Sequence, residues 1–171
     1  MAAVEFAFVA PVMVFLFFAT VEGSDALAAS RRVTLAANTL ADLVAQETEI
    51  ETSAVDALFT GMDAILDQGA VTVDFRLVSV VFNDTTNKPE VHWSRDNSGT
   101  QPYAAGTEYT GPADVSTIDP SASLVVAEVN FSYTPVLSKV LFQSVMFRKS
   151  ATKWPRRSPR VQLCTNGTCS S

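Results

Sequence analysis

Two cysteines and one histidine are the residues of this 171-residue chain best suited to metal or nucleophilic chemistry. Cys164 and Cys169 enclose Thr-Asn-Gly-Thr, a spacing that allows a disulfide across a small hairpin if the domain is exported. In a reducing compartment they would remain free thiols. Two cysteines cannot make a structural zinc site alone, and His92 has no serine or cysteine nucleophile motif to serve. The sequence therefore predicts no metal site, no cofactor and no catalysis.

Glu5 has chemical consequences of another kind, because it precedes a long apolar run. Residues 6–21 carry no charge, and a helix of that length covers about 24 Å, less than the roughly 30 Å hydrocarbon core of a bilayer. A full span from residue 2 to residue 21 places Glu5 inside or at the edge of the apolar layer. A carboxylate there is costly without a counter-charge and usually marks function. Pro11 removes a hydrogen bond from the run, which predicts a kink or local melting.

Three interpretations of the apolar run are open. A secretory signal peptide has a basic start and a small-residue cleavage site; small residues occur near Ala26 and Ala28, but no lysine or arginine precedes Arg31. A plain membrane anchor gives Glu5 no role. In the third interpretation the carboxylate is used, and the residues around it form a recognisable pattern.

Around Glu5 the chain has a small-residue patch, then Val-Glu-Phe, then an apolar run with an early proline, closed by Glu-Gly. The residues concerned are Ala2, Ala3, Val4, Glu5, Phe6, Pro11, Glu22 and Gly23. This pattern resembles the N-terminus of the TadE/TadG-like proteins of tight-adherence (Tad, or Flp) pilus systems, which are type IV pilin-like subunits. Two distal segments resemble the family more loosely: a strand ending in Tyr-Thr-Pro at 129–137 and a basic tail at 154–164.

The resemblance implies roles in processing and assembly for Met1, Glu5 and Phe6. In pilin-like subunits a prepilin peptidase cuts before the first mature residue and a glutamate is fifth, the spacing of Met1 and Glu5. Met1 is then either a processed N-terminus or an initiator methionine. A free amine at Met1 of one subunit would pair with Glu5 of a neighbour and set the register of packed helices. The alternative is that Glu5 only stabilises the helix start through the helix dipole.

Charge is segregated in the outer part of the chain. Residues 42–67 contain seven acids and no base, and residues 139–160 contain seven bases and no acid. These sets pair either within one molecule or between subunits, and a basic tail could also contact anionic lipid headgroups. The candidate inter-subunit charges are Glu47, Glu49, Glu51, Arg156, Arg157 and Arg160. The net charge of −6 argues against nucleic acid as a partner.

Helical signals extend well past the apolar run. Between residues 25 and 50 there is no proline or glycine, which together with an apolar stripe predicts one N-terminal helix of about 45 residues. Gly23 marks a soft point at the junction of its two halves. The stripe consists of Leu27, Leu35, Leu40, Leu43 and Val44 with Ala36, Ala37 and Ala41. Residues 53–69 predict a second helix, with Ser53 as N-cap, Asp56 at the capping-box position and Gly69 as stop.

After residue 69 the apolar period changes to two, which predicts β-strands. We expect strands at 71–82, 90–95, 124–133, 140–148 and 160–163, a turn at 83–88, and a stop at Pro135. A phase slip at Leu77–Val78 indicates either a bulge or a strand buried on both faces. Residues 96–123 are polar and predict a long surface loop that could contact a ligand. The amphipathic half of the long helix should cover the sheet.

The sequence thus predicts an α+β, pilin-like fold with a membrane or filament-core helix at 1–24 and a periplasmic or extracellular domain at 25–171. The resemblance implies a minor pilin or pseudopilin, held in the inner membrane before it acts in pilus initiation, capping or biogenesis outside. Its partners would be other pilin subunits, the inner-membrane assembly platform and the prepilin peptidase. The alternatives are a membrane-anchored periplasmic scaffold and an adhesive tip subunit that uses residues 96–123.

Overall fold

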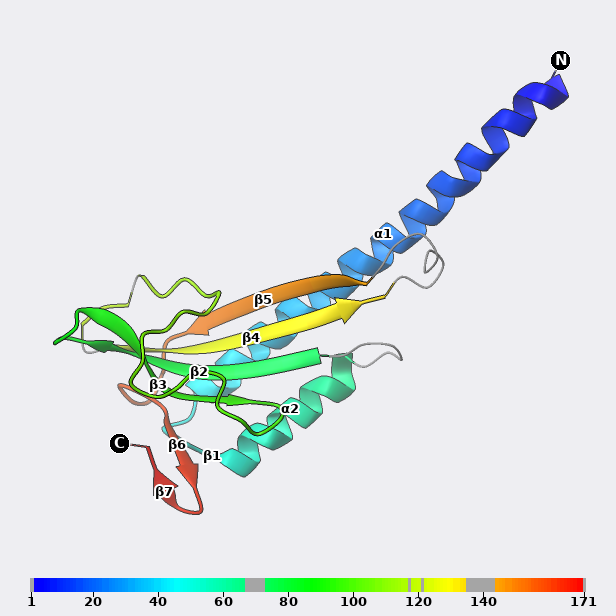
Figure 1. Ribbon diagram of the computed structural model, residues 1–171. Coiled ribbons are helices and arrows are strands. Elements are labelled where there is room, and N and C mark those ends of the chain that lie inside the picture. The colour runs from blue at the N-terminus through cyan, green and yellow to red at the C-terminus, as the bar shows by residue number, and fades with distance from the viewer. Residues whose placement is uncertain (1, 67–72, 117, 121, 135–143, 171) are drawn as a thin grey trace.

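The structure is a computed structural model that describes residues 2–66, 73–116, 118–120, 122–134 and 144–170. A 44-residue helix, α1 (Ala2–Ala45), projects far beyond the remainder of the fold (Figure 1). The elements that follow are β1 (Glu49–Glu51), α2 (Thr52–Leu66), β2 (Val73–Asn83), β3 (Lys88–Asp96), β4 (Ser123–Tyr133), β5 (Val145–Lys153), β6 (Gln162–Thr165) and β7 (Thr168–Cys169). The predicted α+β class and the long N-terminal helix are confirmed.

Helix α1 continues without interruption through Pro11 and Gly23. Local melting at Pro11 therefore does not occur, and a kink at either residue stays a prediction. A proline removes only one backbone donor, and the turns on either side of it keep their own hydrogen bonds.

The second half of α1 packs on the sheet, as expected, through a face that includes five of the eight residues of the predicted stripe. Its buried residues are Val33, Ala36, Ala37, Leu40, Ala41, Val44 and Ala45. Leu27 and Leu35 are 64% and 66% exposed, and Leu43 is 38% exposed, so including these leucines in the buried stripe was wrong. The predicted alanines Ala36, Ala37 and Ala41 are buried together with Leu40 and Val44, and Val33 and Ala45 extend this buried face.

Strands β2 to β5 form an antiparallel sheet in the order β3-β2-β4-β5, and β1, β6 and β7 form a second, small sheet. Helix α1 lies across β4 and β5, and α2 lies near β2 (Figure 1). The predicted strands at 71–82, 90–95 and 124–133 are confirmed within one or two residues. β5 lies later than predicted, at 145–153 rather than 140–148. β1 was not predicted, because three residues are too few to show a period.

The four-stranded sheet is buried on both faces along its centre. Leu77 of β2 belongs to the core beneath α1 and α2, whereas Val78 and Val80 belong to a second core on the opposite face. The phase slip at Leu77–Val78 thus reflects burial on both faces, and the β-bulge lies two residues later, between Ser79 and Val80.

The described part of residues 97–122 has no helix or strand and is mostly exposed, but a few of its residues contribute to the second core. Tyr109, Ala113, Val115 and Ile118 are each at most 8% exposed, and they pack on β2 and β4. The segment also closes the outer edge of β3, because Val91 N–H donates to the Thr107 carbonyl at 2.8 Å. The predicted loop is thus irregular and largely exposed where the structure describes it, and the part not predicted is that its scattered apolar residues cover one face of the sheet.

The boundaries of α2 differ from those predicted. The helix begins at Thr52, so Ser53 lies inside it rather than at the N-cap. Asp56 does not close a capping box, because its carboxylate binds Arg95 of β3 through two hydrogen bonds of 2.7 Å. The Arg95 guanidinium lowers the pKa of Asp56. Gly69, Pro135 and Lys139 lie outside the described residues.

Candidate functional site

The first half of α1 presents apolar side chains on all sides and does not pack against the hydrophobic core of the fold. Val4, Phe6 and Phe8 are 62–76% exposed, and the first residue of α1 that packs against the core is Ala29. By length and composition, α1 is a candidate membrane span. Its most apolar stretch has a mean hydropathy of 2.2, and none of that stretch is buried in the fold. An apolar surface of this size requires lipid or other apolar helices around it.

The few polar side chains of this half satisfy their hydrogen bonds within the helix. The Thr20 hydroxyl donates to the Phe17 carbonyl at 2.7 Å, and the Ser24 hydroxyl donates to the Thr20 carbonyl at 2.8 Å. Such back-bonding removes the need for water around these hydroxyls. The uncharged run at residues 6–21 is therefore chemically suited to an apolar environment.

Glu5 is the exception within this apolar surface. Its side chain is exposed between Val4 and Phe6, and within the described part of the chain it has no ion-pair partner. Its position in the first turn suits the helix dipole. In an apolar environment the dipole alone would leave most of the desolvation cost of a charged carboxylate uncompensated. Met1, the predicted partner group, lies outside the described residues.

Aromatic side chains surround α1 where the packed half begins. Tyr133 and Phe147 have ring centroids 6.4 Å apart, and Phe131 lies 6.2 Å from Phe147. Burial raises the pKa of Tyr133, and the negative charges of Asp25 and Glu22 raise it further. The end of β4 therefore lies beside the junction of the two halves of α1. Amphipathic aromatic residues are typical of the level where a membrane protein meets water.

The segregated charges pair only partly within the molecule. The Arg156 guanidinium forms an ion pair with Asp42 of α1, and the backbone N–H of Arg156 donates to the Ala45 carbonyl at 2.9 Å. Glu51 accepts a hydrogen bond of 3.3 Å from the Gly167 N–H. For Glu47, Glu49, Arg157 and Arg160 the described residues supply no ion-pair partner. Arg156 is thus engaged inside the molecule, and the inter-subunit role of the others stays a prediction.

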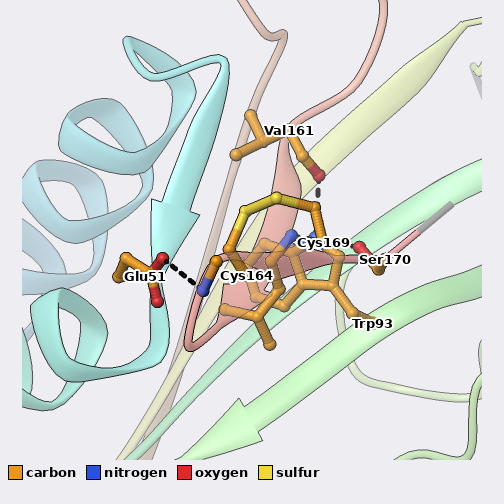
Figure 2. The surroundings of a disulfide bond; sticks show 8 residues. Glu51, Trp93, Val161, Cys164, Cys169 and Ser170 are labelled. Carbon is orange, nitrogen blue, oxygen red and sulfur yellow. Dashed lines mark hydrogen bonds between the residues drawn. A yellow bond between two sulfur atoms is a disulfide. The ribbon is translucent and has the colours of Figure 1, made fainter.

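The predicted disulfide between Cys164 and Cys169 is confirmed. It joins β6 to β7, and the turn residues Asn166 and Gly167 have φ of 51° and 79°, as a tight hairpin turn requires. Figure 2 shows the disulfide close to Trp93, whose Nε1–H donates to the Val161 carbonyl at 2.8 Å. Glu49 also lies near the two sulfur atoms, but sulfurs bonded to each other are not thiolate ligands.

Replacing Cys164 and Cys169 together with serine is expected to lower the free energy of unfolding by about 2 kcal/mol, because a short loop loses its cross-link. Urea unfolding of the full chain in detergent, followed by Trp93 fluorescence, measures this loss. A reductant should destabilise the unaltered protein equally and leave the serine variant unchanged. Equal stability of oxidised and reduced protein would show that β6 and β7 are held by packing alone.

A buried hydrogen-bond network was missed by the sequence reasoning. Glu128 of β4 is 2% exposed and accepts from the Tyr103 hydroxyl at 3.0 Å and from the Tyr109 hydroxyl at 2.6 Å. Gly111 passes so close that an added Cβ would overlap the Tyr109 hydroxyl and the Glu128 carboxylate. We call Tyr103, Tyr109 and Glu128 the outer network. Its one sequence signal is the continuous apolar run from Leu124 to Ala127 in the same strand, which indicates burial on both faces.

The outer network predicts a loss of stability at alkaline pH. Burial raises the pKa of Tyr109, and the hydrogen bond to Glu128 adds to this shift. Because the pKa of Tyr109 is raised in the folded protein, its protonated hydroxyl contributes fully to the free energy of unfolding below about pH 10. This contribution falls as the pH rises above that value, by up to about 1.4 kcal/mol per pH unit. Urea unfolding at pH 9, 10 and 11 should show this fall. The Tyr109→Phe variant should show a flatter dependence, and an unchanged slope would contradict the assignment.

Comparison with known proteins finds one family in this chain. No curated protein and no solved structure matches it. The model of the TadE-like protein family matches residues 1–42, which are nearly the whole of α1 and include Glu5, Pro11 and Gly23. The predicted resemblance is confirmed over this segment. Over its N-terminal helix, the chain is similar to the TadE-like proteins of Tad pilus systems.

Proposed function

We propose that this protein is a non-catalytic minor pilin or pseudopilin of a Tad-type pilus. The observation that carries the proposal is the TadE-like match over an exposed apolar helix with a carboxylate in its first turn. In the inner membrane, lipid would surround the first half of α1. In a filament, the same surface would pack against the helices of other subunits.

Glu5 has a defined role in this proposal. Its carboxylate pairs with the N-terminal amine of a neighbouring subunit, and a helix displaced by one turn leaves both charges unpaired in an apolar medium. The pair therefore sets the register of the subunit during pilus initiation, capping or biogenesis. The outer domain stays in the periplasm before assembly and outside the cell afterwards.

The test is a deletion of the gene followed by complementation with the intact chain. We expect the deletion strain to lose surface pili and the complemented strain to regain them. Antibody detection should find the protein both in the inner membrane and in pili sheared from the cell surface. Normal piliation of the deletion strain would contradict the proposal. Loss of pili with the protein confined to the membrane fraction would indicate an assembly scaffold instead.

A further inference from the structure

A groove lies where the C-terminal end of α1 meets β1 and α2. Its volume is about 530 Å³. The apolar part of its lining comes from both helices and from β1, namely Leu43, Ile50, Ala54, Ala57 and Leu58. Three carboxylates line it as well: Glu47, Glu49 and Glu51, all of them exposed. We call this hollow the acidic groove.

The carboxylates of the acidic groove have little compensation within the molecule. The ion pairs among the described residues are Asp74–Arg76, Glu108–Lys88, Asp56–Arg95 and Asp42–Arg156. None of them includes an acid of the groove, and of these three acids only Glu51 accepts a hydrogen bond from a described residue, the Gly167 N–H. Apolar walls with an acidic rim are complementary to a basic segment that carries a large apolar side chain.

The chain itself has such a segment directly after β5. Residues 153–157 contain Lys153, Trp154 and Arg157, and the Trp154 side chain is 47% exposed. The described residues provide no ion-pair partner for Lys153 or Arg157. Arg156, in contrast, is fixed on α1 by Asp42 and by the Ala45 carbonyl. The segment is therefore held in place with Trp154 and Arg157 exposed and Lys153 half-buried. Tryptophan often provides much of the binding energy at an interface.

We propose that the acidic groove of one molecule binds residues 153–157 of a second copy of this chain. Trp154 of one copy enters between α1 and α2 of the other, where Leu43, Ala57 and Leu58 surround it. Lys153 and Arg157 then lie next to the carboxylates of the rim. Complementary charge identifies the occupant, because the described part of a single molecule gives neither these acids nor these bases an ion-pair partner. The inference rests on the proposed function only in assuming that copies of the chain meet in a pilus or in the inner membrane. The contact itself can be measured with purified protein.

The test is a charge exchange across the proposed contact, measured as self-association of the full chain in detergent micelles by sedimentation. Glu47→Lys and Lys153→Glu should each weaken association about tenfold, because each places like charges together. An equimolar mixture of the two variants, or the double variant, should regain it. Trp154→Ala should also weaken association, and raised salt should weaken that of the unaltered protein.

The matched control is Arg148→Glu, which makes the same charge change on β5. Arg148 lines a separate hollow, together with Tyr103 and Glu128, so its substitution should leave association unchanged. Any association through the apolar half of α1 is common to all variants and does not depend on these charges.

Two results would overturn the inference. One is unaltered protein that stays monomeric at low salt. This result overturns the inference even if a basic peptide of another pilus subunit is found to bind in the acidic groove. The other is a mixture of Glu47→Lys and Lys153→Glu proteins that fails to regain association. Neither result bears on piliation, so the proposed function would stand or fall by its own deletion experiment.

Discussion

Glu5→Gln protein is expected to fold normally in its outer domain and to fail in pilus incorporation. The substitution keeps the shape of the side chain and removes the charge that, in the proposed function, pairs with a neighbouring amine. The lost pairing is expected to cost about 3 kcal/mol per contact, on the order of 100-fold in affinity. The measurement is the ratio of the protein in sheared pili to that in the membrane fraction, by quantitative immunoblot.

The control for this substitution is Asp25→Asn, which removes a charge from the same helix beyond the apolar run. Asp25 is exposed and lies outside the first turn, so its amide variant should enter pili normally. Both variants should give the same thermal unfolding curve by circular dichroism. Pili with normal amounts of the Glu5→Gln protein would leave the carboxylate only the modest role of stabilising the helix start.

Removing both hydroxyls of the outer network, by Tyr103→Phe with Tyr109→Phe, is expected to lower the free energy of unfolding by about 3–5 kcal/mol. Glu128 would keep its buried position and lose the two hydroxyl donors that stabilise it there. Urea unfolding of the full chain at pH 7, followed by circular dichroism, measures the loss. Tyr133→Phe, at a partly buried tyrosine outside the network, should change stability far less.

A third substitution tests whether the loss comes from the unpaired carboxylate. Glu128→Met in the double-phenylalanine background replaces the charge with an apolar side chain of similar length, and most of the stability should return. If the triple variant is no more stable than the double variant, the loss comes from packing around the aromatic rings. The outer network would then contribute little through its hydrogen bonds.

Much of this fold follows from local pattern. The apolar run and the absence of glycine and proline between residues 25 and 50 are sufficient to predict α1, and alternation is sufficient for β2, β3 and β4. The face of α1 that meets the sheet could not be predicted in the same way. Leucine has the greater hydrophobic free energy, yet Ala37 and Ala41 are buried while Leu35 is exposed, because the position of a residue around the helix, and not its own hydrophobicity, decides whether it meets the sheet.

The candidate sites divide along similar lines. Glu5 and the cysteine pair are visible in the sequence, because one is a charge in an apolar run and the other encloses a turn. The acidic groove and the outer network depend on contacts between distant segments. Glu128 lies 19 residues from Tyr109 and 25 residues from Tyr103, and its strand position alone would place it on a solvated face. Only the packing of residues 97–122 over β4 makes it a buried acid.

The absence of a break in α1 has a mechanical consequence for any fibre that includes this protein. A tensile force on the outer domain is transmitted along α1, a continuous helix of about 66 Å, to its apolar half. No hinge within the helix could extend first. The load is then borne by the seam of alanines between α1 and the strands β4 and β5. Under tension the protein should therefore yield by sliding of the sheet along the helix before the helix itself unwinds.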